Sequence, residues 1–369
     1  MKKSELQKVN RKKNKIVVSN AIYVDEKVWF MSRDFNGLLC MDAVSRQIER
    51  VETFPNEMYG QFFLYSAMEM VDDKIYFAPY YAKEIAIYDI KGKMFKKIEI
   101  DESILQRESG KNLFYGIQKY EDYLFFIPAY SKAIVRLNTS NEEICYITEW
   151  NDKISYNYDK NSTFFWTQKV LRKNILYLPF YNINAVLKLN CDSLACEVHK
   201  LNIDETGFSG ICDDGRDIWL YTRKNGDLIK WNPKSDETIR YNIYSEKIID
   251  GWDSLARIIS CNNKIAVYSV RKSLRRLNKV FDSIEINVGE YTFVKDEEQY
   301  TAFYEECEGM LTIFDKKEAK WHVVEISSDE SIFDATKMIC ESGMVMEINE
   351  YLLDDFVADL VLPEKKYIN

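Results

Sequence analysis

A chain of 369 residues exceeds one ordinary compact domain and fits either a closed all-β architecture or two smaller domains. Its composition, 46% hydrophobic and 30% charged, is that of a globular protein and excludes wholesale disorder. The net charge of -9 argues against nucleic acid as the main partner, and no apolar run reaches the length of about eighteen residues that would predict a membrane span.

Residues 1–15 form a basic N-terminal arm, which we interpret as a solvated tail. The arm lacks the apolar stretch of a secretory signal, so a cytoplasmic location is expected. The eight cysteines include no CxxC pair, and their low frequency is typical of reduced, buried thiols. With only two histidines, His199 and His322, a multi-histidine metal site is disfavoured, and we expect neither a metal nor another cofactor.

One five-residue pattern recurs seven times along the chain, with an aliphatic first residue and Asp or Asn at its end. Consecutive copies are about 46 residues apart, which is a period of repeat architectures. The copies are LLCMD (38–42), IAIYD (85–89), IVRLN (134–138), VLKLN (186–190), LIKWN (228–232), LRRLN (274–278) and LTIFD (311–315).

Each copy is predicted to be strand c of a unit with four strands, a to d. Strand b lies about ten residues upstream and is rich in β-branched and aromatic residues, as in VWFMS (28–32) and LFFIP (124–128). Polar turns separate strand a from strand b and strand c from strand d. The units cover about 16–54, 63–100, 113–149, 163–203, 207–243, 254–288 and 290–326.

Four antiparallel strands repeated at this period are typical of β-propeller blades. The strand-c ending followed by a polar hairpin resembles WD40, quinoprotein-type and lactonase-like propellers over residues 16–326. The resemblance implies an all-β propeller of four-stranded antiparallel blades and no particular functional family. We predict seven blades; six is the alternative, with the basic stretch 269–283 of the sixth unit as an insertion.

Residues 327–369 follow the last unit as a C-terminal extension packed on the propeller. Within it, Tyr351, Leu352, Phe356 and Leu360 recur at near-helical spacing after Asn349, which suits a helix cap. We therefore expect a short C-terminal helix, and a helix that recruits a partner is the alternative.

The b–c and d–a connections are longer and more aromatic than the other turns, which marks their end of the propeller as the working face. Three b–c loops share a Pro-x-Tyr motif, and proline ends strand b at a set point, so we expect its tyrosines to be aimed alike. Strand a is expected to be innermost, so that its first residues rim a central channel together with Glu69, Gln118 and Gln168. The candidate ligand-binding residues are Arg33, Asp34, Tyr65, Tyr81, Lys83, Tyr115, Tyr130, Lys132, Trp166, Tyr181, Asn182, Arg223, Lys224 and Trp252.

Tyrosine rings beside amides and cations suit sugars, nucleotides or an extended peptide. The favoured hypothesis is a non-catalytic binding or scaffold propeller whose partner is a small molecule, a glycan or another protein. A purely structural role for the tyrosines, with hydroxyls bonded to the neighbouring blade, stays open.

Two other functions also stay open. A propeller lyase or hydrolase could use carboxylates at the channel mouth, with or without a divalent metal; the candidates are Asp34, Glu57, Glu69 and Glu84. A protein-assembly hub could use the acidic surface, the basic cluster of the sixth unit or the C-terminal helix. No GxSxG, P-loop or GxGxxG motif favours a particular reaction.

Overall fold

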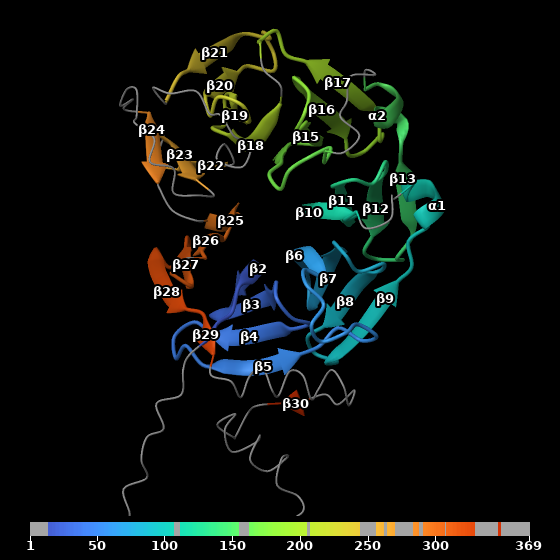
Figure 1. The fold of residues 1–369 in the computed structure, drawn as a ribbon, viewed down its shortest axis with the longest axis vertical. Coiled ribbons are helices and arrows are strands. Elements are labelled where there is room, and N and C mark those ends of the chain that lie inside the picture. Colours follow the sequence, from blue (N-terminus) through green and yellow to red (C-terminus); the bar gives the residue numbers. More distant parts are fainter. Residues whose placement is uncertain are drawn as a thin grey trace, which may run out of the picture.

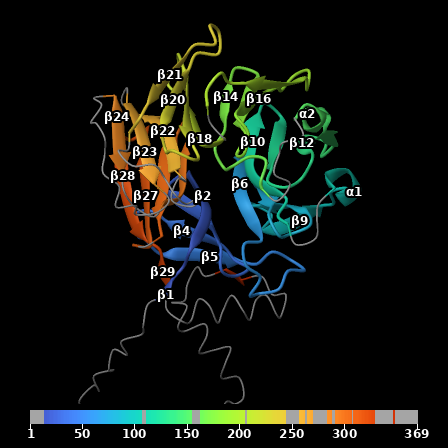
Figure 2. The same ribbon diagram turned by 45° about the horizontal axis from the view of Figure 1, so that its top comes forward.

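The computed structural model describes residues 14–106, 111–154, 162–204, 207–243, 256–261, 264–269, 283–287, 291–306, 308–328 and 346–347. Its sheets stand radially in a ring, with the first strand of each sheet next to the central axis (Figure 1). Figure 2 shows the same inner strands from a tilted direction. The prediction of an all-β propeller with strand a innermost is confirmed.

Six sheets contain a blade of four antiparallel strands that pair in chain order; in blade 1 a fifth strand is added at the outer edge. Blade 1 has β2 (Val18–Val24), β3 (Lys27–Ser32), β4 (Leu38–Asp42) and β5 (Ile48–Glu52); blade 2 has β6 (Tyr65–Val71), β7 (Lys74–Pro79), β8 (Ile85–Asp89) and β9 (Met94–Ile98); blade 3 has β10 (Phe114–Tyr120), β11 (Tyr123–Pro128), β12 (Ile134–Asn138) and β13 (Ile144–Ile147). Blade 4 has β14 (Val170–Arg172), β15 (Ile175–Pro179), β16 (Ala185–Asn190) and β17 (Cys196–Lys200); blade 5 has β18 (Phe208–Asp213), β19 (Ile218–Thr222), β20 (Leu228–Trp231) and β21 (Thr238–Tyr241); the C-terminal blade has β25 (Tyr291–Asp296), β26 (Tyr300–Glu305), β27 (Met310–Asp315) and β28 (Lys320–Glu325).

Between blade 5 and the C-terminal blade lies a sheet with three described strands, β22 (Ala256–Cys261), β23 (Lys264–Ser269) and β24 (Ile284–Asn287). Here β24 pairs parallel with β23, in the position that strand c would take. The prediction of seven four-stranded antiparallel blades is therefore wrong for the sixth unit, and the alternative of six regular blades is supported. The predicted strand-c copy LRRLN (274–278) lies outside the described residues; it is basic, and a strand buried on both faces cannot bury unpaired charges at low cost, which gives a physical reason for finding β24 in that position.

The recurring Asp or Asn at the end of strand c caps the c–d turn. Its side-chain oxygen accepts backbone N–H bonds from residues two and three positions later, as Asp42 does from Val44 (3.0 Å) and Ser45 (2.7 Å). Asn138, Asn190, Asn232 and Asp315 make the same two contacts. Four residues after each anchor the backbone turns left-handed at a non-glycine residue; these residues are Arg46, Lys93, Glu142, Leu194, Asp236 and Ala319.

The hydrophobic core is divided into clusters that lie between neighbouring sheets. Blades 1 and 2, 2 and 3, 3 and 4, and 4 and 5 each share one cluster. Blade 1 also shares a cluster with the C-terminal blade, which closes the ring. The contact between the three-stranded sheet and the C-terminal blade is the smallest, with Ile259, Ala266 and Val294 as its buried members.

The segments that precede blade 1 and follow the C-terminal blade meet at the ring closure. β1 (Asn14–Lys15) pairs with β29 (Ser327–Ser328), and Tyr304 donates its hydroxyl to the Ile16 carbonyl at 2.8 Å. β30 (Met346–Glu347) adds a fifth strand to blade 1 beside β5. The helix expected at 349–361 lies outside the described residues.

Two helices of four residues, α1 (Glu102–Leu105) and α2 (Glu149–Asp152), lie in connections between blades. In the described part of the chain, neither has the length or apolarity to span a membrane. Five cysteines there are free thiols, and Cys40, Cys191, Cys196 and Cys212 among them are buried, as expected.

Candidate functional site

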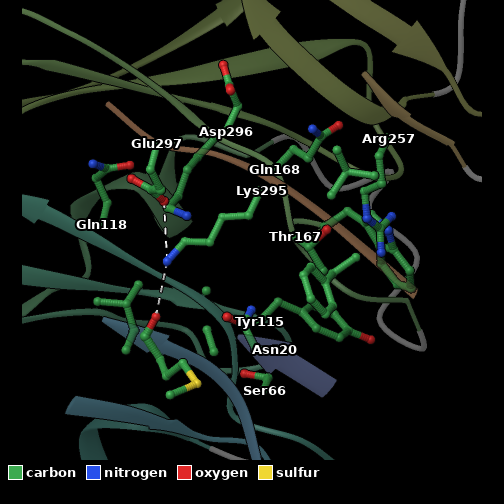
Figure 3. Close-up of a pocket in the computed structure, with 18 of the residues that line it drawn as sticks. Asn20, Ser66, Tyr115, Gln118, Thr167, Gln168, Arg257, Lys295, Asp296 and Glu297 are labelled. Carbon is green, nitrogen blue, oxygen red and sulfur yellow. Dashed lines mark hydrogen bonds and ion pairs between the residues drawn. The ribbon is translucent and has the colours of Figure 1, made fainter. Parts of the chain in front are cut away.

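A cavity of about 1220 Å³ occupies the centre of the ring. The inner strands of all seven sheets line it, which follows from the strand order within each sheet. Its wall contains aromatic and guanidinium groups near the b–c and d–a loops, and lysines and carboxylates further along the strands (Figure 3). A cavity of this size exceeds the usual range for a small-molecule site, so a ligand has room to enter.

A β-bulge recurs near the start of the inner strand in five sheets. The pairing register shifts between Val18 and Asn20, Tyr65 and Ala67, Phe114 and Gly116, Phe208 and Gly210, and Tyr291 and Phe293. Bulges re-aim side chains, and the extra residues Ser19, Ser66 and Tyr115 all line the cavity. Tyr115 is thus a large aromatic ring at a position where blades 1 and 2 have serine.

Six aromatic rings form a continuous arc at the loop end of the cavity, which we call the aromatic mouth. Successive ring centroids are 4.1 to 5.9 Å apart; Phe62 and Phe63 are adjacent in one connection, and each later ring comes from a different loop or strand. Such spacing is that of interacting aromatic pairs. The rings in order are Phe62, Phe63, Tyr80, Tyr115, Trp166 and Tyr181.

Guanidinium groups lie over three of these rings. Arg33 is 5.8 Å from the Phe62 centroid and also forms a bidentate pair with Glu306. Arg223 is 4.3 Å from the Tyr181 centroid and donates to the Asn182 side-chain oxygen.

Arg257, from β22, is 5.5 Å from the Trp166 centroid and only 4% exposed. Burial lowers the pKa of Arg257 to about 10, so it stays charged at neutral pH.

Several buried polar atoms at the mouth have no hydrogen-bond partner among the described residues. They include the indole Nε1 of Trp166, the Thr167 hydroxyl, the Asn20 Oδ1 and the Asn182 Nδ2. Trp166, Thr167 and Asn20 line the cavity. Because buried donors and acceptors normally find a partner, these atoms are available for a ligand.

The residue that directly follows strand b has a structural role. Its carbonyl accepts the backbone N–H that begins the next blade: Tyr80 from Leu113 at 3.0 Å, Ala129 from Phe164 at 2.7 Å and Phe180 from Phe208 at 2.9 Å. The Pro-x-Tyr loops therefore connect adjacent blades through their middle residue. Their tyrosine side chains do not make this connection.

The three motif tyrosines have different surroundings, contrary to the expectation that they are aimed alike. Tyr81 is 36% exposed and contacts Tyr80. Tyr130 is half-buried under the Lys111 ammonium, 4.7 Å from its centroid. Tyr181 is buried and stacks on Trp166.

The other predicted residues divide between the mouth and its surroundings. Arg33, Tyr115, Trp166, Asn182 and Arg223 belong to the mouth or contact it. Asp34, Lys83 and Lys224 are exposed loop residues, and Lys132 donates to the Gln106 side chain at 2.9 Å. Trp252 lies outside the described residues.

Tyr65 does not rim the channel. It is 2% exposed and packs against Phe54 and Phe77 in the core between blades 1 and 2. The bulge in β6 explains this, because Ser66 takes the channel-facing position.

Channel residues that were not among the candidates include Tyr80, Lys169, Arg257 and Lys295. Tyr80 could have been found, because it follows the proline of blade 2 directly. Arg257 and Lys295 sit in short strands whose register the sequence does not fix, and Lys169 directly precedes such a strand.

Gln168, which was expected at the rim, bridges two inner strands. Its amide donates to the Ile258 carbonyl and accepts from the Ile258 N–H, both at 2.8 Å, and it passes over Gly210 of blade 5. A Cβ at Gly210 would come 3.0 Å from the Gln168 Oε1, so glycine leaves room for the bridge.

Lys295 is central to the charged part of the cavity. Its Nζ is 3.6 Å from Glu69 and 3.3 Å from Glu297, and it donates to the Met68 carbonyl at 3.5 Å (Figure 3). Burial alone would lower the pKa of Lys295, but the two carboxylates outweigh it and raise that pKa. Burial raises the pKa of Glu69.

The carboxylates proposed for catalysis do not meet at one point. Glu57 and Glu84 both pair with Lys97, Asp34 lies 3.7 Å from Arg33, and Glu69 is in the channel. The described residues contain no group of three or more His, Cys, Asp or Glu that could hold a metal ion.

Both histidines lie on the fourth strands of their blades, far from the innermost strands. His199 in β17 stacks on Trp231 and bonds Asp236, and His322 in β28 is 3.3 Å from the Tyr23 hydroxyl.

No protein-family model and no curated protein matches the chain. Among solved structures, it is similar to a catalytically inactive virginiamycin B lyase from Staphylococcus aureus with quinupristin, at 15% identity and a TM-score of 0.54, over 82% of this chain and 96% of the other. The RRP9 WD40 repeats match at 9% identity and a TM-score of 0.52, over 85% and 93% of the two chains. BamB from Moraxella catarrhalis matches at 11% identity and a TM-score of 0.52, over 83% and 86%. The chain is therefore a β-propeller, similar in fold alone to propellers of different activities.

Proposed function

We propose that this chain is a binding protein that recognises an anionic, ring-bearing ligand, such as a nucleotide or an acidic sugar, at the aromatic mouth. The observation that carries the proposal is the arc of six rings, with guanidinium groups over three of them and unpaired buried donors beside them.

The chemistry of the mouth favours a ring in the ligand. Exposed or cavity-lining aromatic faces bind planar bases and the apolar face of sugars, and the indole and amide donors supply direction. Trp166 Nε1 and Asn182 Nδ2 are both donors, so the ligand must offer acceptor oxygens or nitrogens.

The charge of the mouth favours an anion. Arg223 forms no ion pair with any described residue, and its guanidinium lies over Tyr181. Arg257 adds a buried positive charge beside Trp166. Arg33 contributes less, because Glu306 neutralises it. The chain as a whole has a net charge of -9, but these arginines make the mouth locally positive, so acidic ligands are attracted there.

Fold similarity gives no support for carrying over the activity of the lyase. A histidine-to-alanine variant of that enzyme is catalytically inactive, whereas both histidines of this chain lie on outer strands away from the cavity. The acids proposed for a propeller enzyme are also dispersed among separate ion pairs.

A thermal-shift screen of the full chain tests the proposal, with uridine monophosphate, adenosine diphosphate and glucuronate against uridine and glucose as neutral counterparts. Binding to the folded state alone raises the melting temperature, and at 100 times Kd it adds about 2.7 kcal/mol. We expect a shift with at least one anionic ring ligand and a smaller shift with its neutral counterpart.

Two variants with matched controls locate the site. Arg223→Ala should weaken binding about tenfold, whereas Arg216→Ala, an 85% exposed arginine at an a–b turn, should not. Trp166→Phe keeps a ring and removes the indole donor, and should weaken binding about three- to tenfold, whereas Trp321→Phe on outer strand β28 should not.

A flat screen with all anionic ring ligands would overturn the proposal and favour a protein partner. Equal affinities for Arg223→Ala and Arg216→Ala would also overturn it, because binding would then lie elsewhere.

A further inference from the structure

Lys169 is a primary amine that faces the central cavity. It directly precedes β14 and lines the cavity in the same stretch as Trp166, Thr167 and Gln168. Its Nζ has no hydrogen bond or ion pair with any described residue, in contrast to Lys295 across the channel.

The space around this amine is open. The ammonium lies beside Gly116 in β10 of the neighbouring blade, where a Cβ would be 3.7 Å from the Lys169 Nζ, and the missing side chain leaves space on that side. The cavity beside it holds about 1220 Å³, enough for a small molecule that passes the aromatic mouth.

The surrounding charges leave Lys169 without a compensating carboxylate of its own. Glu69 and Glu297 are both within 3.6 Å of the Lys295 Nζ. Desolvation in the channel therefore lowers the pKa of Lys169, and repulsion from Lys295 adds to this, while the more distant Glu297 and Glu69 oppose it. A lysine in such surroundings has a larger neutral, nucleophilic fraction at neutral pH.

We propose that Lys169 captures an aldehyde or ketone ligand in the channel as an imine. The inference stands on the cavity, the open space at Gly116 and the absence of an ion pair for this amine among the described residues. It does not depend on an anion bound at the mouth.

The reaction balances without an oxidant or reductant. The Lys169 nitrogen adds to the carbonyl carbon, the C=O π bond breaks, and a proton moves from nitrogen to oxygen to give a carbinolamine. The C–O bond then breaks, the second N–H proton leaves with the oxygen as water, and a C=N bond forms. One water is released for each imine.

The ligand class follows from the route into the channel. A carbonyl compound that reaches Lys169 from the loop end passes the aromatic arc, so an aromatic aldehyde or an open-chain sugar suits the path. The reaction is reversible, so Lys169 would hold such a ligand without consuming it.

Reductive trapping tests this with the full chain. The protein is incubated with benzaldehyde and sodium cyanoborohydride at pH 7.4, and the modified lysines are located by peptide mass spectrometry. An exposed lysine is neutral in about one molecule per thousand at this pH, and each unit by which the pKa falls raises that fraction tenfold. We expect Lys169 to react at least about tenfold faster than Lys119, an exposed lysine on β10.

Lys169→Arg keeps the positive charge and cannot form an imine, so it should lose the fast-reacting site, whereas Lys119→Arg should keep it. The comparison of Lys169 with Lys119 in the unmodified chain needs no variant and holds even if Lys169→Arg fails to fold. A rate for Lys169 equal to or below that of Lys119 would overturn the proposal.

Benzaldehyde is uncharged, so its reaction with Lys169 is measured independently of anion binding at the mouth. If Lys169 is labelled selectively and no nucleotide raises the melting temperature, the imine site is supported and the anion site is rejected. The reverse pattern, nucleotide binding without selective labelling, would reject the imine site alone.

Discussion

The Gln168 bridge gives a prediction whose magnitude follows from its contacts. Gln168→Leu keeps the approximate side-chain size and removes two hydrogen bonds of 2.8 Å to Ile258. Each neutral bond contributes about 0.5–1.5 kcal/mol, and the Ile258 backbone groups face a cavity where water can replace part of the loss. We expect the free energy of unfolding to fall by about 1–2 kcal/mol.

The assay is urea unfolding followed by tryptophan fluorescence at 25 °C. Gln118→Leu is the matched control, because Gln118 lines the same cavity but donates only to the adjacent Lys119 carbonyl. Gly210→Ala adds a second test: its Cβ would lie 3.0 Å from the Gln168 Oε1 and disrupt the same bridge. The two substitutions should therefore be less than additive when combined.

The idea that Gln168 links blade 4 to the three-stranded sheet would be refuted by a Gln168→Leu effect no larger than that of Gln118→Leu. Full additivity of Gln168→Leu with Gly210→Ala would refute it as well, since the glycine would then have no role in the bridge.

Three further predictions concern turns and pH. Ala319→Gly should raise the free energy of unfolding in urea by up to about 1 kcal/mol, because Ala319 has a left-handed φ of 49° that glycine adopts more easily. The control is Ala195→Gly: Ala195 is exposed and not left-handed, so this substitution should lower the free energy of unfolding. Gly207→Ala should lower the free energy of unfolding by more than about 1 kcal/mol, because Gly207 has φ 144° and a Cβ would lie 2.1 Å from the Tyr181 carbonyl oxygen. Gly60→Ala is the control and should have a smaller effect, because a Cβ at Gly60 would have no atom within 4 Å. Asp42→Asn should lower the melting temperature most at pH 7, and by progressively less as the pH falls below about 3.9. The bond from Lys27 at 2.8 Å and the turn N–H bonds lower the pKa of Asp42 in the folded state, so the stabilisation is complete above the unfolded-state pKa and is lost only as the pH falls through the lower folded-state pKa; an effect that did not change with pH would contradict this.

The positions of most strands could be predicted because the anchor residue has a local function. Asp or Asn at the end of strand c accepts N–H bonds from residues two and three positions later, so an Asp or Asn marks the c–d turn in the antiparallel blades. The same reasoning did not foresee β24 in the sixth unit; the LRRLN copy there lies outside the described residues, and its arginines oppose burial on both faces.

Which side chains line the mouth was less predictable from the sequence, because it depends on β-bulges and on contacts between residues far apart in the chain. The bulge in β6 turns Tyr65 into the core and Ser66 into the channel, and the bulge in β10 gives Tyr115 the channel position. A one-residue shift reverses which face a side chain occupies, and the alternation of apolar residues does not reveal it.

Arg257 and Lys295 were missed for a related reason. Each is the lone basic residue of its inner strand, and the sequence gives no indication of whether it faces the core or the channel. Their partners are far away in sequence: Lys295 bonds the carbonyl of Met68, which is 227 residues earlier. Only closure of the ring brings such groups together.

Ring closure also explains why polar side chains cross the channel where they do. Among the described residues, the three-stranded sheet shares three buried apolar residues with the C-terminal blade, fewer than at the other joints, so the described apolar packing is weakest here. Gln168 reaches the inner strand of this sheet from blade 4, and Lys295 reaches blade 2 from the C-terminal blade. Both cross-links lie inside the ring on either side of the incomplete sheet, where they can restrain the inner strands that carry Arg257 and Lys295. A ligand bound between these strands would contact the same side chains that cross-link the ring. Its binding would therefore stabilise the joint between the three-stranded sheet and the C-terminal blade.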